Sequence, residues 1–112
     1  MAIIVYTEDP EKLLQSIKET IDGGEIATWA YDSDGDFSHT APQWNKKAWL
    51  RPNSQEDRIV FNILSPLETK MSRTVYAVYH GRFIEMLLSH FDLLFASARA
   101  TALPTKSDVL EP

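Results

Sequence analysis

The first 24 residues contain the pattern that most constrains the fold. Residues 2–7 form a short apolar and β-branched run, which predicts a buried strand. Asp9-Pro10 follows, and this pair favours a helix start because the Asp carboxylate accepts amides of the first turn and Pro fits the first helical position. Apolar residues then recur at helical spacing until Gly23-Gly24, where the chain can leave the helix. The chain therefore begins with a strand and an amphipathic helix.

Most of the remaining chain has the pattern of strands. We expect them over 26–31, 37–41, 47–51, 58–64 and 74–79. Asp34-Gly35 suits a two-residue type I′ hairpin between the first two of these. Gly81 permits a tight strand-to-helix turn, and apolar side chains recur at helical spacing from Phe83 to Phe91. Residues 93–101 fit either an extension of this helix or a final strand.

These elements predict an α+β fold in the order β-α-β-β-β-β-β-α, with or without a final β. The expected architecture is a two-layer sandwich, an antiparallel sheet of about five strands with two helices on one face. A chain of 112 residues fits one domain, which we assign to residues 1–103. The polar residues 104–112 are expected to form a flexible C-terminal tail.

Composition and charge argue against several classes of protein. The chain has no cysteine, which excludes disulfides, thiolate zinc sites and a cysteine nucleophile. The apolar run at the N-terminus is too short for a signal peptide or a membrane span, so we expect a cytoplasmic protein without a membrane partner. The net charge of −5 argues against general binding to nucleic acid, which attracts basic surfaces.

An aromatic cluster is the first candidate site, because all three tryptophans lie between residues 29 and 49. Its members are Trp29, Tyr31, Trp44 and Trp49, with Lys46, Lys47 and Arg51 among them. Rings on an open sheet can contact a partner, although in a small domain they more often form core. We therefore expect a non-enzymatic protein-binding or regulatory module whose partner is another protein or a second copy. Single-stranded nucleic acid is an alternative partner for rings with interleaved basic residues.

The stretch Tyr79–Arg82 is the second candidate site. A helix beginning there would offer free amides and a positive dipole end to an anion, and Arg82 would add a guanidinium. His80 and His39 could take part as acid or base near neutral pH. The alternative function is thus a small-molecule or anion-binding pocket, with or without catalysis. In the simpler interpretation, the glycine relieves the turn and Arg82 pairs with Glu85.

The sequence gives no support for a metal or another cofactor. The run Asp32-x-Asp34-x-Asp36 resembles the start of an EF-hand loop, but the required Gly and Glu positions are occupied by Phe37 and Gln43. The three histidines lack the usual spacing of metal ligands. Phosphate loops, nucleophile elbows and zinc-protease motifs are absent, so no catalytic residue is assigned.

Two stretches have the character of family signatures. They are WNKKAWLRP over residues 44–52 and VYHGRFIEMLLSHF over residues 78–91. Together they resemble a family of small uncharacterised bacterial cytosolic proteins with no assigned function. The resemblance implies a bacterial cytosolic protein, and it implies no activity and no site residues.

Overall fold

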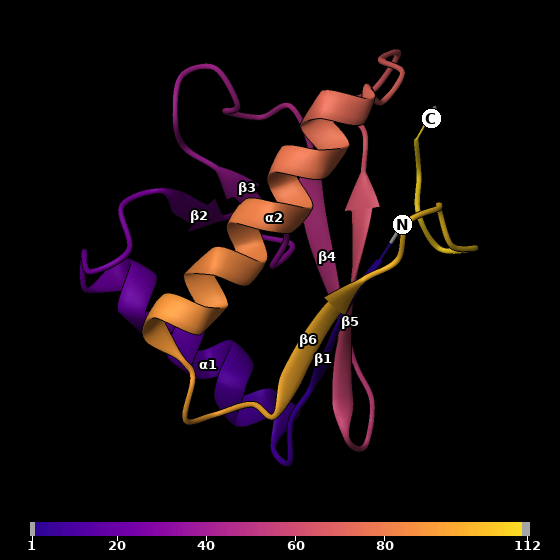
Figure 1. The fold of residues 1–112 in the computed structure, drawn as a ribbon. Coiled ribbons are helices and arrows are strands. Elements are labelled where there is room, and N and C mark those ends of the chain that lie inside the picture. The colour runs from indigo at the N-terminus through magenta and orange to yellow at the C-terminus, as the bar shows by residue number, and fades with distance from the viewer. Residues whose placement is uncertain (1, 111–112) are drawn as a thin grey trace.

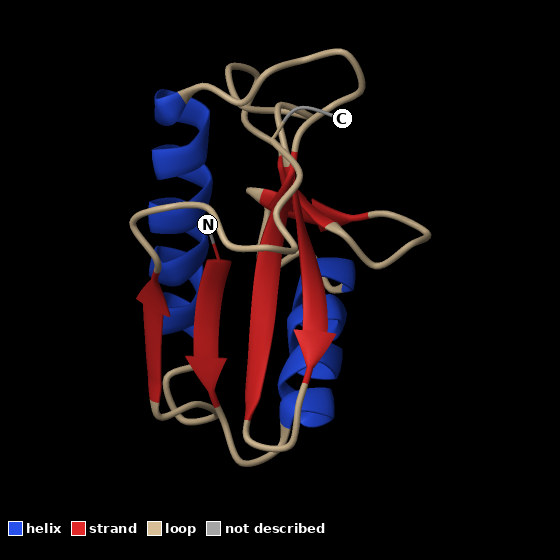
Figure 2. Ribbon diagram, turned by 90° about the vertical axis from the view of Figure 1, so that its right-hand side faces the viewer, coloured by secondary structure: helices blue, strands red, loops and turns tan. Residues whose placement is uncertain are grey.

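The computed structural model describes residues 2–110 as two layers, a six-stranded antiparallel sheet with two helices on one face (Figures 1 and 2). The strands are β1 (Ala2–Tyr6), β2 (Trp29–Tyr31), β3 (Phe37–His39), β4 (Trp49–Ser54), β5 (Arg58–Leu64) and β6 (Ser97–Ala100). The helices are α1 (Pro10–Asp22) and α2 (Arg73–His90). The strand order is β2-β3-β4-β5-β1-β6. The predicted α+β sandwich is confirmed, with six strands.

The first strand and helix form as the sequence predicts. Asp9 caps α1 by accepting a hydrogen bond from the amide of Lys12 at 3.1 Å, and Pro10 begins the helix. The apolar stripe of α1 packs into the core. The helix ends at Gly23, and Gly24 takes a positive φ of 81° that favours glycine.

The largest departure from prediction lies in residues 73–90, which form one helix of 18 residues. The strand predicted over 74–79 and the strand-to-helix turn at Gly81 are both wrong. The side chain of Ser72 caps the helix by accepting from the Val75 amide at 3.1 Å. The β-branched and aromatic residues of 74–79 favour a strand only weakly, and burial of one helical face, including Tyr79 and Phe83, overrides that preference.

Smaller differences concern strand limits and one turn. Both β2 and β3 are shorter than expected, whereas β4 continues through Pro52 into the predicted loop. Pro52 is tolerated because β3 pairs with β4 at Phe37 and Leu50 alone, so β4 is an edge beyond that pair. The type I′ turn is also wrong, since only Gly35 has a positive φ within the loop 32–36. The ambiguous residues 93–101 include a strand, β6.

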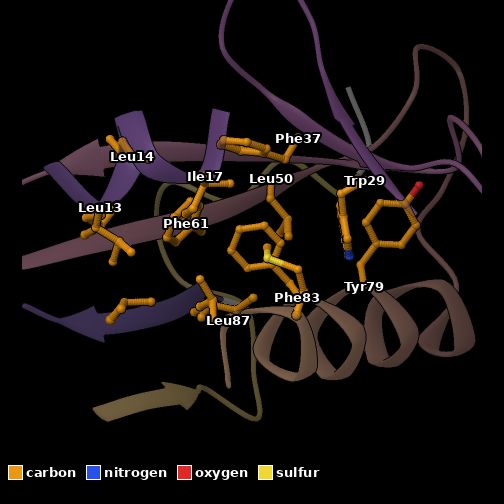
Figure 3. Close-up of a cluster of buried hydrophobic side chains, with 14 of the residues drawn as sticks. Leu13, Leu14, Ile17, Trp29, Phe37, Leu50, Phe61, Tyr79, Phe83 and Leu87 are labelled. Carbon is orange, nitrogen blue, oxygen red and sulfur yellow. The ribbon is translucent and has the colours of Figure 1, made fainter. Parts of the chain in front are cut away.

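The core lies between the inner face of the sheet and the two helices (Figure 3). Its centre is a set of aromatic rings from the sheet and from α2. Ring centroids are 5.0 Å apart for Trp29 and Phe83, 4.7 Å for Phe61 and Phe83, and 5.7 Å for Phe37 and Phe83. Phe83 of α2 therefore joins β2, β3 and β5, and this contact fixes the helix against the sheet.

The segment after β6 crosses the end of the outer face of the sheet and runs beside β5 (Figure 2). The Val109 amide donates to the Ile63 carbonyl at 2.9 Å, and the Asp108 carboxylate accepts from the side chain of Asn62 at 3.0 Å. Burial raises the pKa of Asp108. Flexibility of residues 104–112 stays a prediction, and 111–112 lie outside the described residues. Within residues 2–110, neither helix combines the length and apolar character needed to cross a membrane.

Candidate functional site

A cleft of about 310 Å³ lies between the C-terminal half of α2 and the residues around β2 and β3. We refer to it as the α2 cleft. One wall is a single face of the helix, formed by Arg82, Glu85, Met86, Ser89 and His90. The other wall is formed by Thr28, Trp29, His39, Ala41, Gln43 and Trp44. The cleft therefore brings together segments that are distant in the sequence.

Some of the residues singled out from the sequence meet in this cleft. Trp29, His39 and Trp44 come from the predicted aromatic and strand region, and Arg82 comes from the second candidate site. Sequence spacing does not connect these two regions, because their proximity depends on how α2 packs on β2 and β3.

Tyr79 of α2 joins the two walls of the α2 cleft without lining it. Its side chain is fully buried, and its hydroxyl contacts three groups of β3 and of the loop that follows it. The hydroxyl donates to the carbonyl of Trp44, accepts from the amide of His39 at 3.3 Å, and lies 3.1 Å from the Ser38 hydroxyl. Tyr79 thus links α2 to β3 and to the loop 40–48.

His39 faces the α2 cleft as a neutral hydrogen-bond donor. Its Nδ1 accepts a hydrogen bond from the Ala41 amide at 3.1 Å, so Nδ1 carries no proton and the neutral ring carries it on Nε2. Burial lowers the pKa of His39, and the charge of Arg82 lowers it further, whereas Glu85 raises it. Burial and the charge of Arg82 both favour the neutral form of His39 at pH 7.

Arg82 and Glu85 form an ion pair on the rim of the cleft, as the simpler interpretation of the sequence predicts. The Arg82 Nη1 lies 3.3 Å from Glu85 Oε1, and both side chains are more than half exposed. Such a pair contributes little to stability, so a ligand can compete for the guanidinium. Arg82 lies inside α2 and not at its N-terminus, so the predicted anion site on free helical amides is wrong.

His80 lies outside the α2 cleft. Only 3% of its surface is exposed, and its Nδ1 is 2.7 Å from the Tyr76 carbonyl within the same helix. Its ring packs against the ring of Tyr76, with centroids 4.7 Å apart. His39 and His80 therefore do not share the predicted pocket, since His39 lines the α2 cleft and His80 does not.

The aromatic cluster does not form one surface. Trp29 is 2% exposed and belongs to the core, where its ring meets those of Tyr79 and Phe83 edge-on. Trp44 is half-buried at the cleft, and Trp49 is half-buried in β4. The Tyr31 hydroxyl donates to Asp22, which raises the pKa of Tyr31. These rings therefore serve different parts of the fold.

Carboxylates of Asp32, Asp34 and Asp36 lie within 4.8 Å of one another in the loop between β2 and β3. Arg51 binds Asp36 through Nε at 3.0 Å and Nη2 at 2.8 Å, and this pairing raises the pKa of Arg51. One carboxylate of the group is therefore already satisfied by a guanidinium. No metal or cofactor is assigned to this loop.

Glu85, Ser89 and His90 line the cleft and were not predicted as site residues from the sequence. Arg82, Glu85 and Ser89 follow one another at helical spacing, which puts them on the same side of the helix. That spacing is the signal that could have extended the site. It could not show which element faces this side of the helix.

Comparison with known proteins found no match to the chain. No family model matches it, and neither does any curated protein or solved structure. The resemblance suggested by residues 44–52 and 78–91 therefore stays a prediction.

Proposed function

We propose that this protein binds a small anionic molecule in the α2 cleft, with His39 and Arg82 as the groups that recognise it. The observation that carries the proposal is the convergence of these two hydrogen-bond donors, from β3 and α2, on one cleft. Its volume of about 310 Å³ lies at the small end of the range for ligand pockets. A ligand of a few to about a dozen heavy atoms suits that space.

The chemistry of the walls favours a carboxylate over a highly charged anion. Arg82 offers a planar fork that binds carboxylates through paired hydrogen bonds, and a ligand carboxylate can replace Glu85 as its partner. His39 adds a neutral donor at Nε2. Glu85 remains at the rim and repels additional negative charge. The indole of Trp44 offers an apolar surface for the body of the ligand.

The hydrogen bonding of His39 supports binding rather than catalysis. A general base needs a free lone pair within reach of the ligand. In neutral His39, Nδ1 is occupied by the Ala41 amide and Nε2 already carries the proton. His39 therefore donates a hydrogen bond without accepting a proton, which suits a non-enzymatic binding protein.

Titration with benzoate, acetate and inorganic phosphate, followed by amide chemical shifts in NMR spectra, tests the proposal. We expect saturable shifts around Trp44 and Glu85 with benzoate and weaker binding of acetate, which lacks a ring. Arg82→Gln should weaken benzoate at least about fivefold, equivalent to ~1 kcal/mol. Arg99→Gln is the matched control and should leave the affinity unchanged, because Arg99 of β6 is exposed and pairs with Ile4 on the face of the sheet away from the helices.

Two results would contradict the proposal. One is benzoate binding with equal affinity to the wild type and to Arg82→Gln, and the other is the absence of saturable shifts with all three probes. Shifts confined to residues outside the cleft would place the site elsewhere.

Binding of a protein is the second candidate function. The observation that favours it is the outer face of the sheet, which no helix covers within residues 2–110 and which contains Trp49 (Figure 2). Single-stranded nucleic acid is less well supported, since Trp29 is core and Arg51 is paired with Asp36.

A further inference from the structure

The α2 cleft is lined by one basic and one acidic side chain. Among the described residues that line it, Arg82 is the one Lys or Arg, and Glu85 is the one Asp or Glu. Both charges act on the pKa of His39, in opposite directions, which indicates that both side chains lie on the side of α2 that faces β3. The cleft therefore offers a ligand a partner for a negative group and, next to it, a partner for a positive group.

The contact between Arg82 and Glu85 leaves most of the guanidinium unused. Arg82 Nη1 lies 3.3 Å from Oε1 and 3.5 Å from Oε2 of Glu85, which is longer than a usual hydrogen bond. Within residues 2–110, Nε and Nη2 of Arg82 donate no hydrogen bond to the protein. These two atoms form a pair of donors that a carboxylate can bind side by side. A ligand carboxylate can therefore bind Arg82 at the cost of a weak, exposed contact.

A carboxylate bound to Arg82 changes the surroundings of Glu85. A simple carboxylate would leave Glu85 without its cation and next to a second negative charge, which opposes binding. A ligand with an ammonium beside its carboxylate removes this repulsion, because the ammonium can pair with Glu85. Ser89, one turn further along the same side of α2, adds a hydroxyl that can accept from the ammonium. The exchange thus replaces one ion pair by two.

We infer that the ligand of the α2 cleft is an α-amino acid with an apolar side chain, bound as its zwitterion by Arg82 and Glu85. The inference rests on the proposed function, and it identifies the anionic group of that ligand as the carboxylate of the amino acid. The two charges of the ligand must lie close together, because Arg82 and Glu85 are in contact. In an α-amino acid a single carbon separates them. The side chain then packs against Trp44 and the buried Met86.

Size and net charge both favour this class of ligand. A cleft of about 310 Å³ admits about a dozen heavy atoms, which includes an amino acid as large as phenylalanine. The chain has a net charge of −5, and a ligand without net charge approaches it without the repulsion that an anion meets. An amine without a carboxylate suits the cleft less well, because it would leave Arg82 and the Nε2 donor of His39 without an acceptor.

Isothermal titration calorimetry with three matched compounds tests the inference. L-phenylalanine, hydrocinnamate and phenethylamine share the same ring and chain, but hydrocinnamate lacks the ammonium and phenethylamine lacks the carboxylate. We expect L-phenylalanine to bind the wild type at least about fivefold more tightly than either of the others. In para-(aminomethyl)benzoate the ring separates the two charges, so this compound should bind no more tightly than benzoate.

Glu85→Gln separates the roles of the two charges. It should weaken L-phenylalanine by about fivefold or more and leave hydrocinnamate bound equally or more tightly, because the uncharged amide neither attracts the ammonium nor repels the carboxylate. Arg82→Gln should weaken both compounds. Glu19→Gln is the matched control and should leave both affinities unchanged, since Glu19 is exposed on α1 and does not line the cleft. Circular dichroism shows whether each variant folds.

The outcomes distinguish this inference from the proposed function. If hydrocinnamate binds the wild type as tightly as L-phenylalanine and loses affinity in Arg82→Gln, the amino acid is overturned and the carboxylate site stands. This comparison of compounds in the wild type does not depend on whether a variant folds. A preference for L-phenylalanine that persists in a folded Glu85→Gln would also overturn the inference. Binding of benzoate without L-phenylalanine overturns the inference alone, whereas binding of none of the compounds overturns both.

Discussion

Replacing Tyr79 by Phe removes the hydroxyl that joins the walls of the α2 cleft and leaves the aromatic ring in place. The ring continues to pack against Trp29, so no cavity of the size of a side chain is created. The change therefore isolates the polar contacts with Ser38, His39 and Trp44.

The three contacts differ in what their loss costs. Ser38 keeps its hydrogen bond to the Ala48 carbonyl, and the Trp44 carbonyl keeps the Lys47 amide at 3.2 Å. The hydroxyl's hydrogen bond to Trp44 is nevertheless lost, at about 1 kcal/mol, and the buried amide of His39 loses the Tyr79 oxygen, at about 1–2 kcal/mol. We expect a total loss of about 2–3 kcal/mol in the free energy of unfolding.

Urea denaturation followed by tryptophan fluorescence measures this loss. With a slope of about 1.3 kcal/mol/M, the midpoint should fall by about 2 M at an unchanged slope. Tyr31→Phe is the matched control, since it removes an exposed hydrogen bond to Asp22 and should cost less than about 1 kcal/mol. Equal losses in the two variants would refute the role of Tyr79 as a link between the walls. Benzoate affinity should also fall in Tyr79→Phe and should stay unchanged in Tyr31→Phe.

Gly81→Ala should stabilise the protein by about 0.5–1 kcal/mol in thermal or urea denaturation, because Gly81 is helical and an added Cβ meets open space; destabilisation would favour the turn predicted from the sequence. Because the pKa of His39 is lower in the folded protein than in the unfolded chain, the unfolded chain takes up the proton at higher pH than the folded protein does. His39 therefore contributes stability above about pH 6.5, and this contribution is lost on acidification. Between about pH 7.5 and 5.5, the wild type should therefore lose more stability than His39→Asn, and equal losses would contradict the shift. Arg51→Gln should cost about 1–2 kcal/mol, and less in an Asp36→Asn background, as a double-mutant cycle by urea denaturation would show; additive losses would mean that the pair is not coupled.

The elements with strong local signals could be predicted from the sequence. The cap at Asp9 and the apolar stripe of α1 are both local signals, and both favour the same helix, so this helix forms as expected. The alternation of β5 gave the limits 58–64 for the same reason. The first half of α2 could not be predicted in this way, because its start depends on a capping serine, and its β-branched and aromatic residues acquire their helical role only by packing on the sheet.

The candidate site was predicted in its parts and missed as a whole. Residues such as His39, Trp44 and Arg82 attracted attention through their chemistry, which sequence displays. Their convergence depends on the placement of α2 across β2 and β3, which sequence spacing does not specify. Trp29 shows the same limit, since an indole in a short strand has the same sequence signal whether it is core or surface.

The single residue pair between β3 and β4 has a consequence for local opening. Among residues 2–110, Phe37 and Leu50 form the one ladder pair that attaches β2 and β3 to the rest of the sheet, whereas β4 and β5 share pairs from Trp49 to Ser54. Residues 28–48 are therefore held mainly by side chains, above all Trp29, Phe37 and Tyr79. A segment attached in this way separates from the core at lower free energy than the whole protein unfolds. We expect the amides of residues 28–48 to exchange with solvent faster than those of β1, β4 and β5. The same local opening would widen the entrance of the α2 cleft for the proposed ligand.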